Sequence, residues 1–295
     1  MDRHLAWQRD KPVAADLFIP FLDRSLELLA TDGRCGFICS DRWRFMAFAE
    51  AFRTKWLPRL KIVQQETFLA ADAFLRDIDS YPHVLVAVKR ETKTKLIAAP
   101  AVTKSKTLTE LGCSVKVGPA LGCTPAFVLE PGEDDVETEL LWPWVDGTDV
   151  QEGAVIFAGR RVVAMYGDDG KLVNLDCFPF LKSRLERYQE KLKAQSIVRA
   201  GAPWFRPIDR VRVCDWKRPK LLVPEIAKVP RLAIDRAGMI PSHGVYAIFA
   251  PGDDVDGLYD RLCGGKLAGA LNGIAPRVKG GYVRCYRRFL LEIPI

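Results

Sequence analysis

Residues 16–43 (DLFIPFLDRSLELLATDGRCGFICSDRW) are typical of a helix followed by a short buried strand. Gly33 is suited to end the helix, because glycine accepts the left-handed backbone that follows a last turn. Residues 35–39 then form an apolar run of strand length, and polar residues follow at 40–43. A helix packed on a parallel strand is the repeating unit of an open α/β sheet, whose functional residues gather at the carboxyl ends of strands. The helix itself is predicted from apolar residues at helical spacing: Leu17, Phe18, Phe21, Leu22, Leu26 and Leu29.

The sequence as a whole predicts two domains. After a second helix at 43–57, strands are expected at 60–68 and 84–88, so that residues 1–92 form one α/β domain. Residues 93–107 are rich in Lys and Thr and are expected to be a linker. Residues 108–295 would form a mixed α/β domain with helices at 179–198 and 258–271, strands at 220–224, 231–235 and 244–250, and a terminal strand from 284.

Composition narrows the class of protein. No apolar run reaches the roughly 20 residues of a membrane span, and the charged N-terminal segment does not resemble a signal peptide. Eight cysteines are scattered without a Cys-x-x-Cys pair, and the three histidines have no ligand spacing, so we expect reduced thiols, a cytoplasmic location and no metal site. No nucleophile elbow and no phosphate-binding glycine loop is present.

Charge is distributed unevenly. The net charge is +7, and residues 182–295 carry 22 Lys or Arg against 11 Asp or Glu. A basic domain is the electrostatic signature of a polyanion partner such as DNA, because neutralised phosphates release counterions. The simpler alternative is a solvated surface, and charge by itself leaves both open.

Several stretches resemble a known family when they are taken in order. In the first half they are Asp16 to Phe21, Leu28 to Gly33, and Phe37 to Trp43. These resemble the segment after the catalytic motif of adenine-specific, S-adenosylmethionine-dependent DNA methyltransferases, which occur in restriction–modification and phage-exclusion systems. The resemblance continues through the target-recognition domain of that family, at Gly118–Phe127, Leu181–Leu192, Trp204–Arg206, Pro219–Pro224 and Ile293-Pro294.

Two motifs of that family are missing here. The chain has no glycine-rich turn for the methyl donor and no Asn/Asp-Pro-Pro-Tyr/Phe tetrapeptide for the target adenine; indeed it has no Pro-Pro dipeptide. The resemblance therefore implies the C-terminal portion of such an enzyme: part of a Rossmann-like methyltransferase sheet, followed by a mixed α/β target-recognition domain that binds double-stranded DNA. A truncated gene, a split subunit whose partner supplies the N-terminal catalytic half, and a degenerate copy all remain open.

The resemblance also implies roles for individual residues. Phe21 would lie against the adenine ring of S-adenosylmethionine, with Asp16 near the same pocket; without the resemblance they would be a core aromatic and a helix N-terminal charge. The target base must be flipped out of the duplex and stacked on an aromatic side chain. Phe74 fits that role best, and Phe68 is the alternative.

DNA contacts are expected from two basic and aromatic clusters. Arginine is suited to bidentate contacts with guanine, and any of these cations could instead be a plain surface charge. The candidates are Trp204, Arg206, Lys217, Arg218 and Lys220 in one cluster, and Arg284, Arg287 and Arg288 in the other.

The function expected is thus methyl transfer from S-adenosylmethionine to the exocyclic amino group of adenine, for which this chain by itself lacks essential parts. Two alternatives belong to other classes: a stand-alone DNA-binding specificity module, and a vestigial protein without activity. An exposed hydrophobic sheet edge would favour a missing partner.

Overall fold

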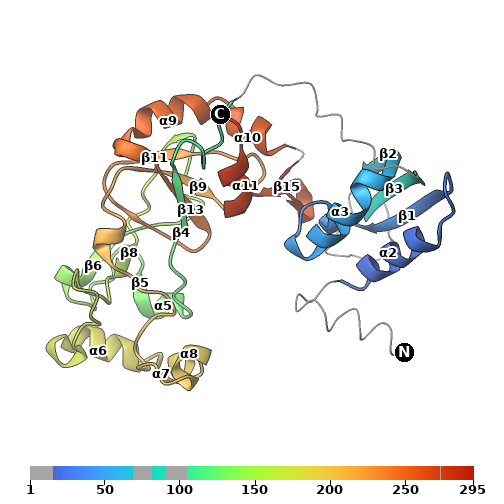
Figure 1. Cartoon of the computed structure of the whole chain (residues 1–295). Helices are drawn as coiled ribbons and strands as arrows, with labels where there is room; N and C mark the ends of the chain where they lie inside the picture. The colour runs from blue at the N-terminus through green and yellow to red at the C-terminus, as the bar shows by residue number, and fades with distance from the viewer. Residues whose placement is uncertain (1–15, 69–81, 91–104, 273) are drawn as a thin grey trace. The chain divides into compact units, whose positions relative to one another are not determined.

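The computed structural model describes residues 16–68, 82–90, 105–272 and 274–295. The chain divides into two compact units, which are coloured from blue to red along the chain in Figure 1. The first unit comprises Met1–Lys104 and Gly273–Arg284, and the second comprises Ser105–Asn272 and Cys285–Ile295. The assignment of residues 273–284 to the first unit is a feature that the sequence did not predict.

The first unit contains a three-stranded sheet in the order β1-β3-β2. Its strands are β1 (Arg34–Ser40), β2 (Leu60–Thr67) and β3 (Pro82–Lys89), close to the predicted ranges. The central strand β3 is antiparallel to both neighbours. Hence β1 and β2 run in the same direction with β3 inserted between them.

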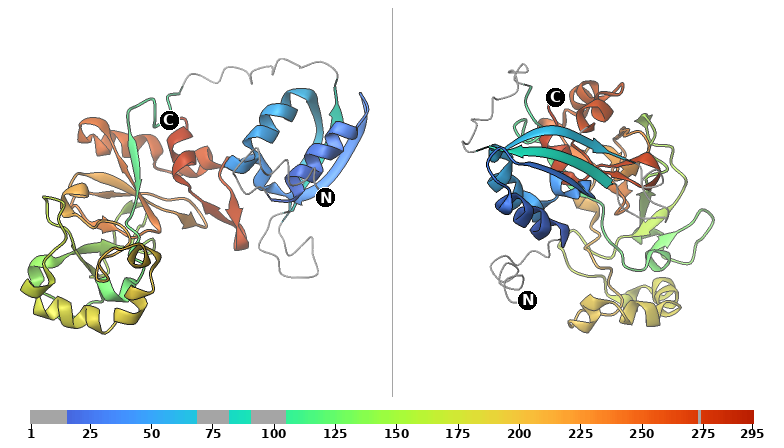
Figure 2. Two further views of the ribbon diagram at one scale, coloured as in Figure 1. Left: turned by 60° about the horizontal axis from the view of Figure 1, so that its bottom comes forward. Right: turned by 90° about the vertical axis from the view of Figure 1, so that its right-hand side faces the viewer.

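Helices α2 (Phe18–Leu28) and α3 (Glu50–Trp56) cover one face of this sheet (Figure 2). The predicted helix over 43–57 is wrong at its start, because residues 41–44 and 47–49 form separate 3-10 turns before α3. The Arg53 guanidinium donates to the carbonyl oxygens of Trp43 and Met46, at 2.8 Å each, and so holds this broken segment on α3. The core beneath the helices consists of Ile19, Leu22, Leu26, Trp43, Ala49, Phe52, Trp56, Leu85 and Ala87.

A hairpin near the C-terminus also belongs to the first unit. Its strands are β14 (Arg277–Val278) and β15 (Tyr282–Arg284), paired antiparallel. Gly280 and Gly281 connect them at φ +81° and +79°, a conformation that glycine adopts without steric cost.

The second unit is built on two mixed sheets that share one hydrophobic core. A five-stranded sheet has the order β4-β13-β9-β11-β7, and a four-stranded sheet has the order β12-β6-β8-β5. Strands β9 and β13 agree with the predicted strands at 220–224 and 244–250. The bounds are β4 Ser114–Val117, β5 Val128–Leu129, β6 Leu141–Val145, β7 Gly153–Ala154, β8 Arg161–Val163, β9 Lys220–Pro224, β10 Ile226–Ala227, β11 Ala233–Asp235, β12 Ile240–Pro241 and β13 Val245–Phe249.

Two predicted helices and one predicted strand of this unit need correction. The expected long helix at 179–198 is three short helices, and the one at 258–271 is two, separated by Gly264 and Gly265 at φ +63° and +84°. Most of the expected terminal strand is helix α11, which packs beside β4. Arg284 ends β15, and Pro294 forms an isolated bridge with Thr107. The bounds are α5 Thr124–Phe127, α6 Pro179–Glu186, α7 Gln189–Lys193, α8 Ser196–Arg199, α9 Val255–Leu262, α10 Lys266–Leu271 and α11 Arg287–Glu292.

The architecture is therefore mixed α/β in both units, as predicted. Within the described ranges, no helix has the length and apolar character that a bilayer span requires.

Candidate functional site

Buried polar side chains gather where the three strands of the first unit end or begin. Asp41 follows β1 and is 7 % exposed, and His83 lies at the start of β3 and is 1 % exposed. Thr67, at the end of β2, places its hydroxyl 2.9 Å from His83 Nδ1. The ring of Trp43 meets that of His83 at 5.7 Å, and within the described part of the chain neither Trp43 Nε1 nor His83 Nε2 has a hydrogen-bond partner.

Burial shifts the pKa values of the two titratable groups in opposite directions. It raises the pKa of Asp41 to about 6, although Arg44 and Arg42 oppose the shift. It lowers the pKa of His83 to about 4, and here Arg44 acts in the same direction as burial. In both cases the low-dielectric surroundings favour the neutral form of the side chain. At neutral pH His83 is therefore uncharged.

These opposite shifts predict opposite pH dependences for two variants. Below about pH 6.5, folded His83 resists the protonation that the unfolded chain gains, so wild-type stability falls as pH falls toward 4. Below about pH 6, folded Asp41 takes up a proton before the unfolded chain does, so wild-type stability rises. Relative to wild type, His83→Gln should therefore gain stability on acidification. Asp41→Asn removes a buried charge and should be more stable than wild type near neutral pH, and this difference should shrink on acidification. Urea unfolding followed by tryptophan fluorescence from about pH 4.5 to 7.5 measures both, and parallel profiles for all three proteins would contradict this assignment.

Of the two residues expected near the methyl donor, Phe21 lies in the first turns of helix α2 and Asp16 lies just before this helix. The side chain of Phe21 is 67 % exposed, so the prediction that it is free to stack on a ligand is compatible with its surroundings. Asp16 is half-buried, and its carboxylate lies 3.6 Å from the Arg42 guanidinium, just past the end of β1. That ion pair connects the start of α2 to the segment around Asp41.

Of the two residues predicted to stack on the target base, the structure describes only one. Phe74 lies outside the described residues. Phe68, the alternative, directly follows β2 and is half-buried, and its N–H donates to the Pro82 carbonyl at 2.9 Å. Phe68 is thereby attached to the first residue of β3, next to His83.

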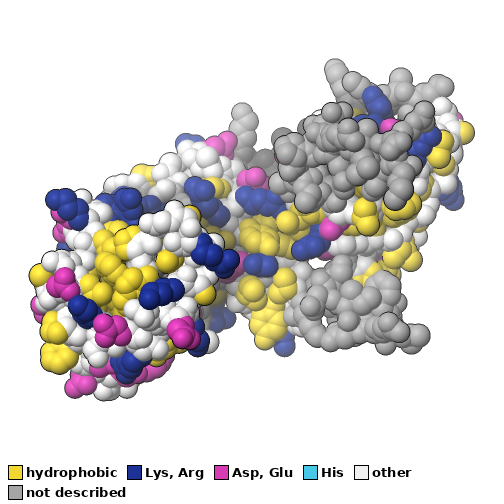
Figure 3. Space-filling model, turned by 90° about the horizontal axis from the view of Figure 1, so that it is seen from below, with side chains coloured by type: hydrophobic (Ala, Val, Ile, Leu, Met, Phe, Trp, Pro, Cys, Tyr) yellow, Lys and Arg dark blue, Asp and Glu magenta, His cyan; other side chains and the backbone are white. Residues whose placement is uncertain are grey.

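In the second unit, three cation–aromatic pairs lie along residues 204–217. The Lys193 ammonium is 5.9 Å from the Trp204 ring, the Arg210 guanidinium is 5.9 Å from Tyr166, and the Lys217 ammonium is 5.7 Å from Trp142. The three cations are exposed, while the rings pack on or within the hydrophobic core. Figure 3 shows on this unit a hydrophobic patch bordered by Lys and Arg side chains.

Other predicted DNA-contacting residues near this segment have partners within the protein. The Arg206 guanidinium donates to the carbonyls of Pro207 and Ile208, at 3.0 and 2.7 Å, and so shapes its own loop. Arg218 is bound to Asp253 at 2.7 Å but stays largely exposed. Lys220 is fully buried, with its ammonium 2.6 Å from the Asp235 carboxylate. The prediction of a DNA contact is therefore wrong for Lys220, because an ammonium without any accessible surface cannot reach a phosphate.

The three arginines near the C-terminus do not form a single cluster within one unit. Arg284 ends β15 in the first unit, whereas Arg287 and Arg288 begin α11 in the second. Arg287 Nε donates to the Val115 carbonyl at 2.8 Å, and the Arg288 guanidinium lies 4.4 Å from the Phe289 ring. Arg287 and Arg288 thus have partners within the second unit, and Arg284 belongs to the first unit.

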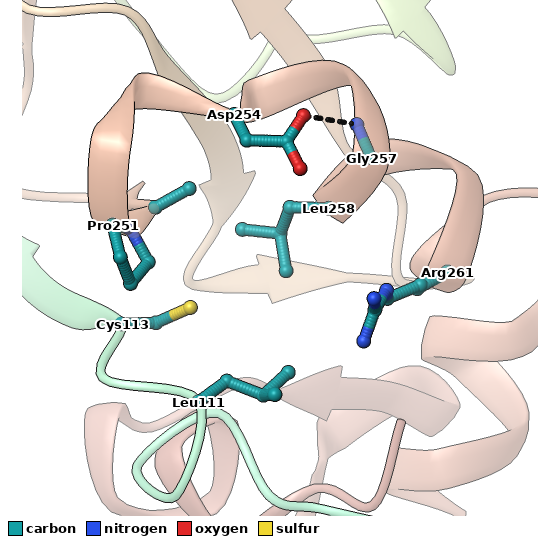
Figure 4. Close-up of a pocket in the computed structure, with 8 residues that line it drawn as sticks. Leu111, Cys113, Pro251, Asp254, Gly257, Leu258 and Arg261 are labelled. Carbon is teal, nitrogen blue, oxygen red and sulfur yellow. Dashed lines mark hydrogen bonds between the residues drawn. The ribbon is translucent and has the colours of Figure 1, made fainter.

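A pocket of about 190 Å³ lies beside α9 in the second unit (Figure 4). Leu111, Cys113 and Leu258 give it an apolar lining, and Arg261 faces it from the end of the helix. Asp254 also lines the pocket, but its carboxylate caps the helix by accepting from Gly257 N at 3.0 Å. No residue singled out in the sequence contributes to this pocket. The described ranges contain no group of three His, Cys, Asp or Glu arranged to hold a metal ion.

Comparison with known proteins finds similarity to Type II methyltransferases. The chain is 24 % identical to Type II methyltransferase M.BstVI of Geobacillus stearothermophilus, 26 % to M.PaeR7I of Pseudomonas aeruginosa and 25 % to M.XhoI of Xanthomonas vasicola. Each match covers 95 % of this chain but only 61, 58 and 62 % of the respective relative. No family model matches the chain.

The fold also has a solved counterpart. The structure of the Type IIL restriction-modification enzyme MmeI in complex with DNA matches with a TM-score of 0.64 at 11 % identity. The match covers 94 % of this chain and 41 % of that chain. The chain therefore spans about three fifths of its sequence relatives and less of the solved enzyme, and it resembles the C-terminal portion predicted above.

Sequence reasoning missed most of what surrounds the predicted residues. Residues 40–43 were expected to be functional because they end a strand, but nothing in the sequence joined them to His83, some 40 residues later. Likewise, Trp142, Tyr166 and Lys193 lie outside every motif recognised in the sequence. In these three pairs, the basic residue is brought over the aromatic one by the packing of segments that are separate in the sequence.

Proposed function

We propose, because the chain resembles Type II DNA methyltransferases along 95 % of its length, that it acts as the C-terminal part of an adenine-specific DNA methyltransferase. In this proposal the first unit is part of the catalytic domain, and the second is the target-recognition domain. The observation that carries the proposal is the extent of the similarity, because it includes both units while leaving about two fifths of each relative unmatched.

The proposed reaction transfers a methyl group to the exocyclic amine of a flipped adenine. The amine nitrogen attacks the methyl carbon, the carbon–sulfur bond breaks, sulfur leaves as a neutral thioether, and the amine loses one proton to water. S-adenosylmethionine supplies the methyl group when bound. Because the amine lone pair is weakly nucleophilic within the aromatic ring, the protein must orient it and hold the base in place.

This chain would supply only some of the contacts that the methyl donor needs. The exposed face of Phe21 suits an adenine ring, since a flat heterocycle and an aromatic side chain exclude water from each other. Asp16 stands nearby, fixed by Arg42. A glycine-rich phosphate or amino-acid cradle is absent from the sequence. We therefore expect the chain by itself to bind S-adenosylmethionine weakly or not at all.

DNA recognition is assigned in this proposal to the second unit. Trp204, Lys217 and Arg218 would contact the duplex directly, and Arg206 would present the loop that reads base edges. Arg284, Arg287 and Arg288 would contribute phosphate contacts. A fully buried Lys220 would instead hold strand β9 in register with β11.

The test of the proposal is methyl incorporation. The chain by itself should transfer no tritium from labelled S-adenosylmethionine to DNA. A fusion that places the unmatched part of M.PaeR7I ahead of Met1 should methylate adenine. Robust incorporation by the chain by itself, or methylation of cytosine by the fusion, would contradict the proposal.

Two variants of the active fusion test the stacking residue. Phe74→Ala should lower turnover on duplex DNA more than it lowers DNA affinity, because base–aromatic stacking is worth about 1–3 kcal/mol. Phe68→Ala is the matched comparison, since it removes the other phenylalanine of the same connection between β2 and β3. Unchanged kinetics for Phe74→Ala together with a strong effect of Phe68→Ala would assign the role to Phe68.

A further inference from the structure

The pocket against helix α9 in the second unit is lined by no residue to which the proposed function assigns a role (Figure 4). Its volume is about 190 Å³, and two of its lining residues, Leu258 and Ala250, are only 5 % and 4 % exposed. An apolar cavity of about 150 Å³ takes up benzene, so this pocket has room for one ring with a short substituent. Sites for larger ligands measure about 300–1,000 Å³, which excludes a nucleotide here. The volume therefore limits the ligand to a small molecule.

Three segments that are separate in the sequence fix the walls of the pocket. Leu111 and Cys113 belong to the turn before β4, which backbone hydrogen bonds of 2.9 Å close at Gly112 and Cys113. Gly112 has φ +76°, a conformation that glycine adopts without steric cost, and a Cβ atom on it would lie 3.4 Å from Pro251 Cγ. This turn therefore packs on Pro251, which follows β13, and Leu258 of α9 forms the third side. The apolar walls are thus held by backbone hydrogen bonds and packing.

A single cation faces this apolar space. Arg261 lies one turn beyond Leu258 on the same face of α9, and its guanidinium points toward the space above Leu111 (Figure 4). Arg261 is exposed, and within the described residues it forms no hydrogen bond or ion pair. Burial raises the pKa of the Cys113 thiol, and the positive charge of Arg261 opposes that rise. The guanidinium is therefore close enough to act on a group bound between these walls.

The two charged residues of the pocket stand at opposite ends of α9. Asp254 is the N-cap of the helix, and its carboxylate accepts from Gly257 N at 3.0 Å. Arg261 follows seven residues later, which is about 10 Å along a helix axis. The negative charge at the start of the helix repels an anion, whereas the positive charge at its end attracts one. An anionic group in the pocket is consequently directed to Arg261, and the rest of the ligand to Leu258 and Pro251.

We propose that this pocket binds a small carboxylate whose body is a single apolar ring or a branched aliphatic chain. The planar guanidinium of Arg261 presents paired N–H donors that match the two oxygens of a carboxylate. The body removes water from Leu111, Pro251 and Leu258, which favours binding. Apolar walls also lower the local dielectric constant, so the ion pair is stronger than in bulk water. This inference goes beyond the proposed function and does not depend on it.

Fluorine NMR on the full chain tests the ligand class with para-fluorophenylacetate as the probe. Titration should broaden the probe signal with a Kd of about 0.1–1 mM, as expected for about ten non-hydrogen atoms. Para-fluorobenzyl alcohol lacks the charge and para-fluorobenzylamine reverses it, so both should bind roughly 10-fold more weakly or worse. Trifluoroacetate carries the head group without the ring and should show no saturable binding. If the amine or trifluoroacetate binds as tightly as the probe, the proposal is wrong.

Three variants locate the probe and separate local charge from net charge. Arg261→Gln removes the cation and should weaken probe binding by roughly 10-fold or more. Asp254→Asn keeps a residue that caps helices equally well and removes the repelling charge, so binding should tighten by roughly twofold. Arg236→Gln is the matched control, because it removes a positive charge that pairs with Asp256 on the same helix but outside the pocket. Equal losses for Arg261→Gln and Arg236→Gln would show that the probe follows net charge and would overturn the site.

Thermal unfolding shows whether each variant is folded and whether it binds. Asp254, Arg261 and Arg236 are exposed, so their variants should unfold close to the wild-type midpoint without probe. Saturating probe should raise the midpoint of wild type and of Arg236→Gln, and should leave that of Arg261→Gln unchanged.

Two further arms decide the place and the kind of ligand. Leu111→Trp fills the pocket without changing a charge, so it should abolish probe binding, and a folded Leu111→Trp protein that binds the probe normally would overturn the site. A short peptide that ends in phenylalanine presents the same ring and carboxylate on a chain terminus. If this peptide binds more tightly than the free acid, the pocket belongs to a protein partner and the proposed ligand class is wrong.

Discussion

Replacing Lys193, Arg210 and Lys217 together by glutamate should lower the affinity for duplex DNA by roughly two to three orders of magnitude at about 0.1 M salt. Each of these exposed cations lies over an aromatic ring that packs on or within the core of the second unit. The rings hold the charges on residues 204–217 and at the end of α7, where Lys193 lies. Loss of three phosphate contacts should also reduce the salt slope by about three.

The control for this experiment changes the net charge by the same amount elsewhere. Lys171, Lys182 and Arg236 lie in the same unit but are already paired, with Asp169, Asp176 and Asp256. Their replacement by glutamate should weaken binding far less. Filter binding or fluorescence anisotropy between about 50 and 200 mM salt measures both slopes. Equal losses would show that binding follows net charge only, and no loss in either triple would show that the cation–aromatic segment is a solvated surface.

The second large effect concerns stability. Lys220→Met should lower the free energy of unfolding of the second unit by about 3–5 kcal/mol, because it leaves the Asp235 carboxylate buried without its counter-charge. The pair is 0 % and 1 % exposed, with 2.6 Å between the ammonium and the carboxylate. Lys220 also donates to the Trp216 carbonyl at 2.6 Å, and burial lowers its pKa despite the attraction of Asp235.

Two further variants separate charge from packing. Adding Asp235→Asn to Lys220→Met should restore part of the loss, since the buried charge is removed while an amide oxygen can still accept from Ala237 N, now at 2.9 Å from the carboxylate. Lys228→Met, at an exposed position after β9, should change little. Urea unfolding monitored by tryptophan fluorescence gives the three values. A Lys220→Met protein as stable as wild type would show that the pair is not desolvated in solution.

Local patterns in the sequence determined much of the secondary structure. Alternating or continuous apolar runs located β1, β2, β3, β9 and β13, because a strand needs only a few residues and its pattern is local. Helix α2 was likewise predicted from its spacing. Motif order along the chain was enough to indicate the methyltransferase resemblance, which the comparisons with Type II methyltransferases bear out.

The continuity of the helices and the secondary structure of the C-terminal residues were decided by the tertiary structure. The helices expected over 43–57, 179–198 and 258–271 are broken, since side-chain contacts such as those of Arg53 hold turns that propensity does not predict. The C-terminal residues expected as a strand are helix α11, which packs beside β4. Propensity is a weak preference of a few tenths of a kcal/mol per residue, and packing readily overrides it.

The candidate site shows the same division. The sequence by itself determined which residue types are present: an aromatic at position 21, polar residues at a strand end, and an excess of Lys and Arg in the second half. Only the tertiary structure decided that Lys220 is buried against Asp235, that Lys217 lies over Trp142, and that Arg206 donates to the carbonyls of its own loop. The physical reason is that burial, ion pairing and edge exposure depend on contacts between residues far apart in the chain, and a local pattern carries no information about which distant residue will be the neighbour.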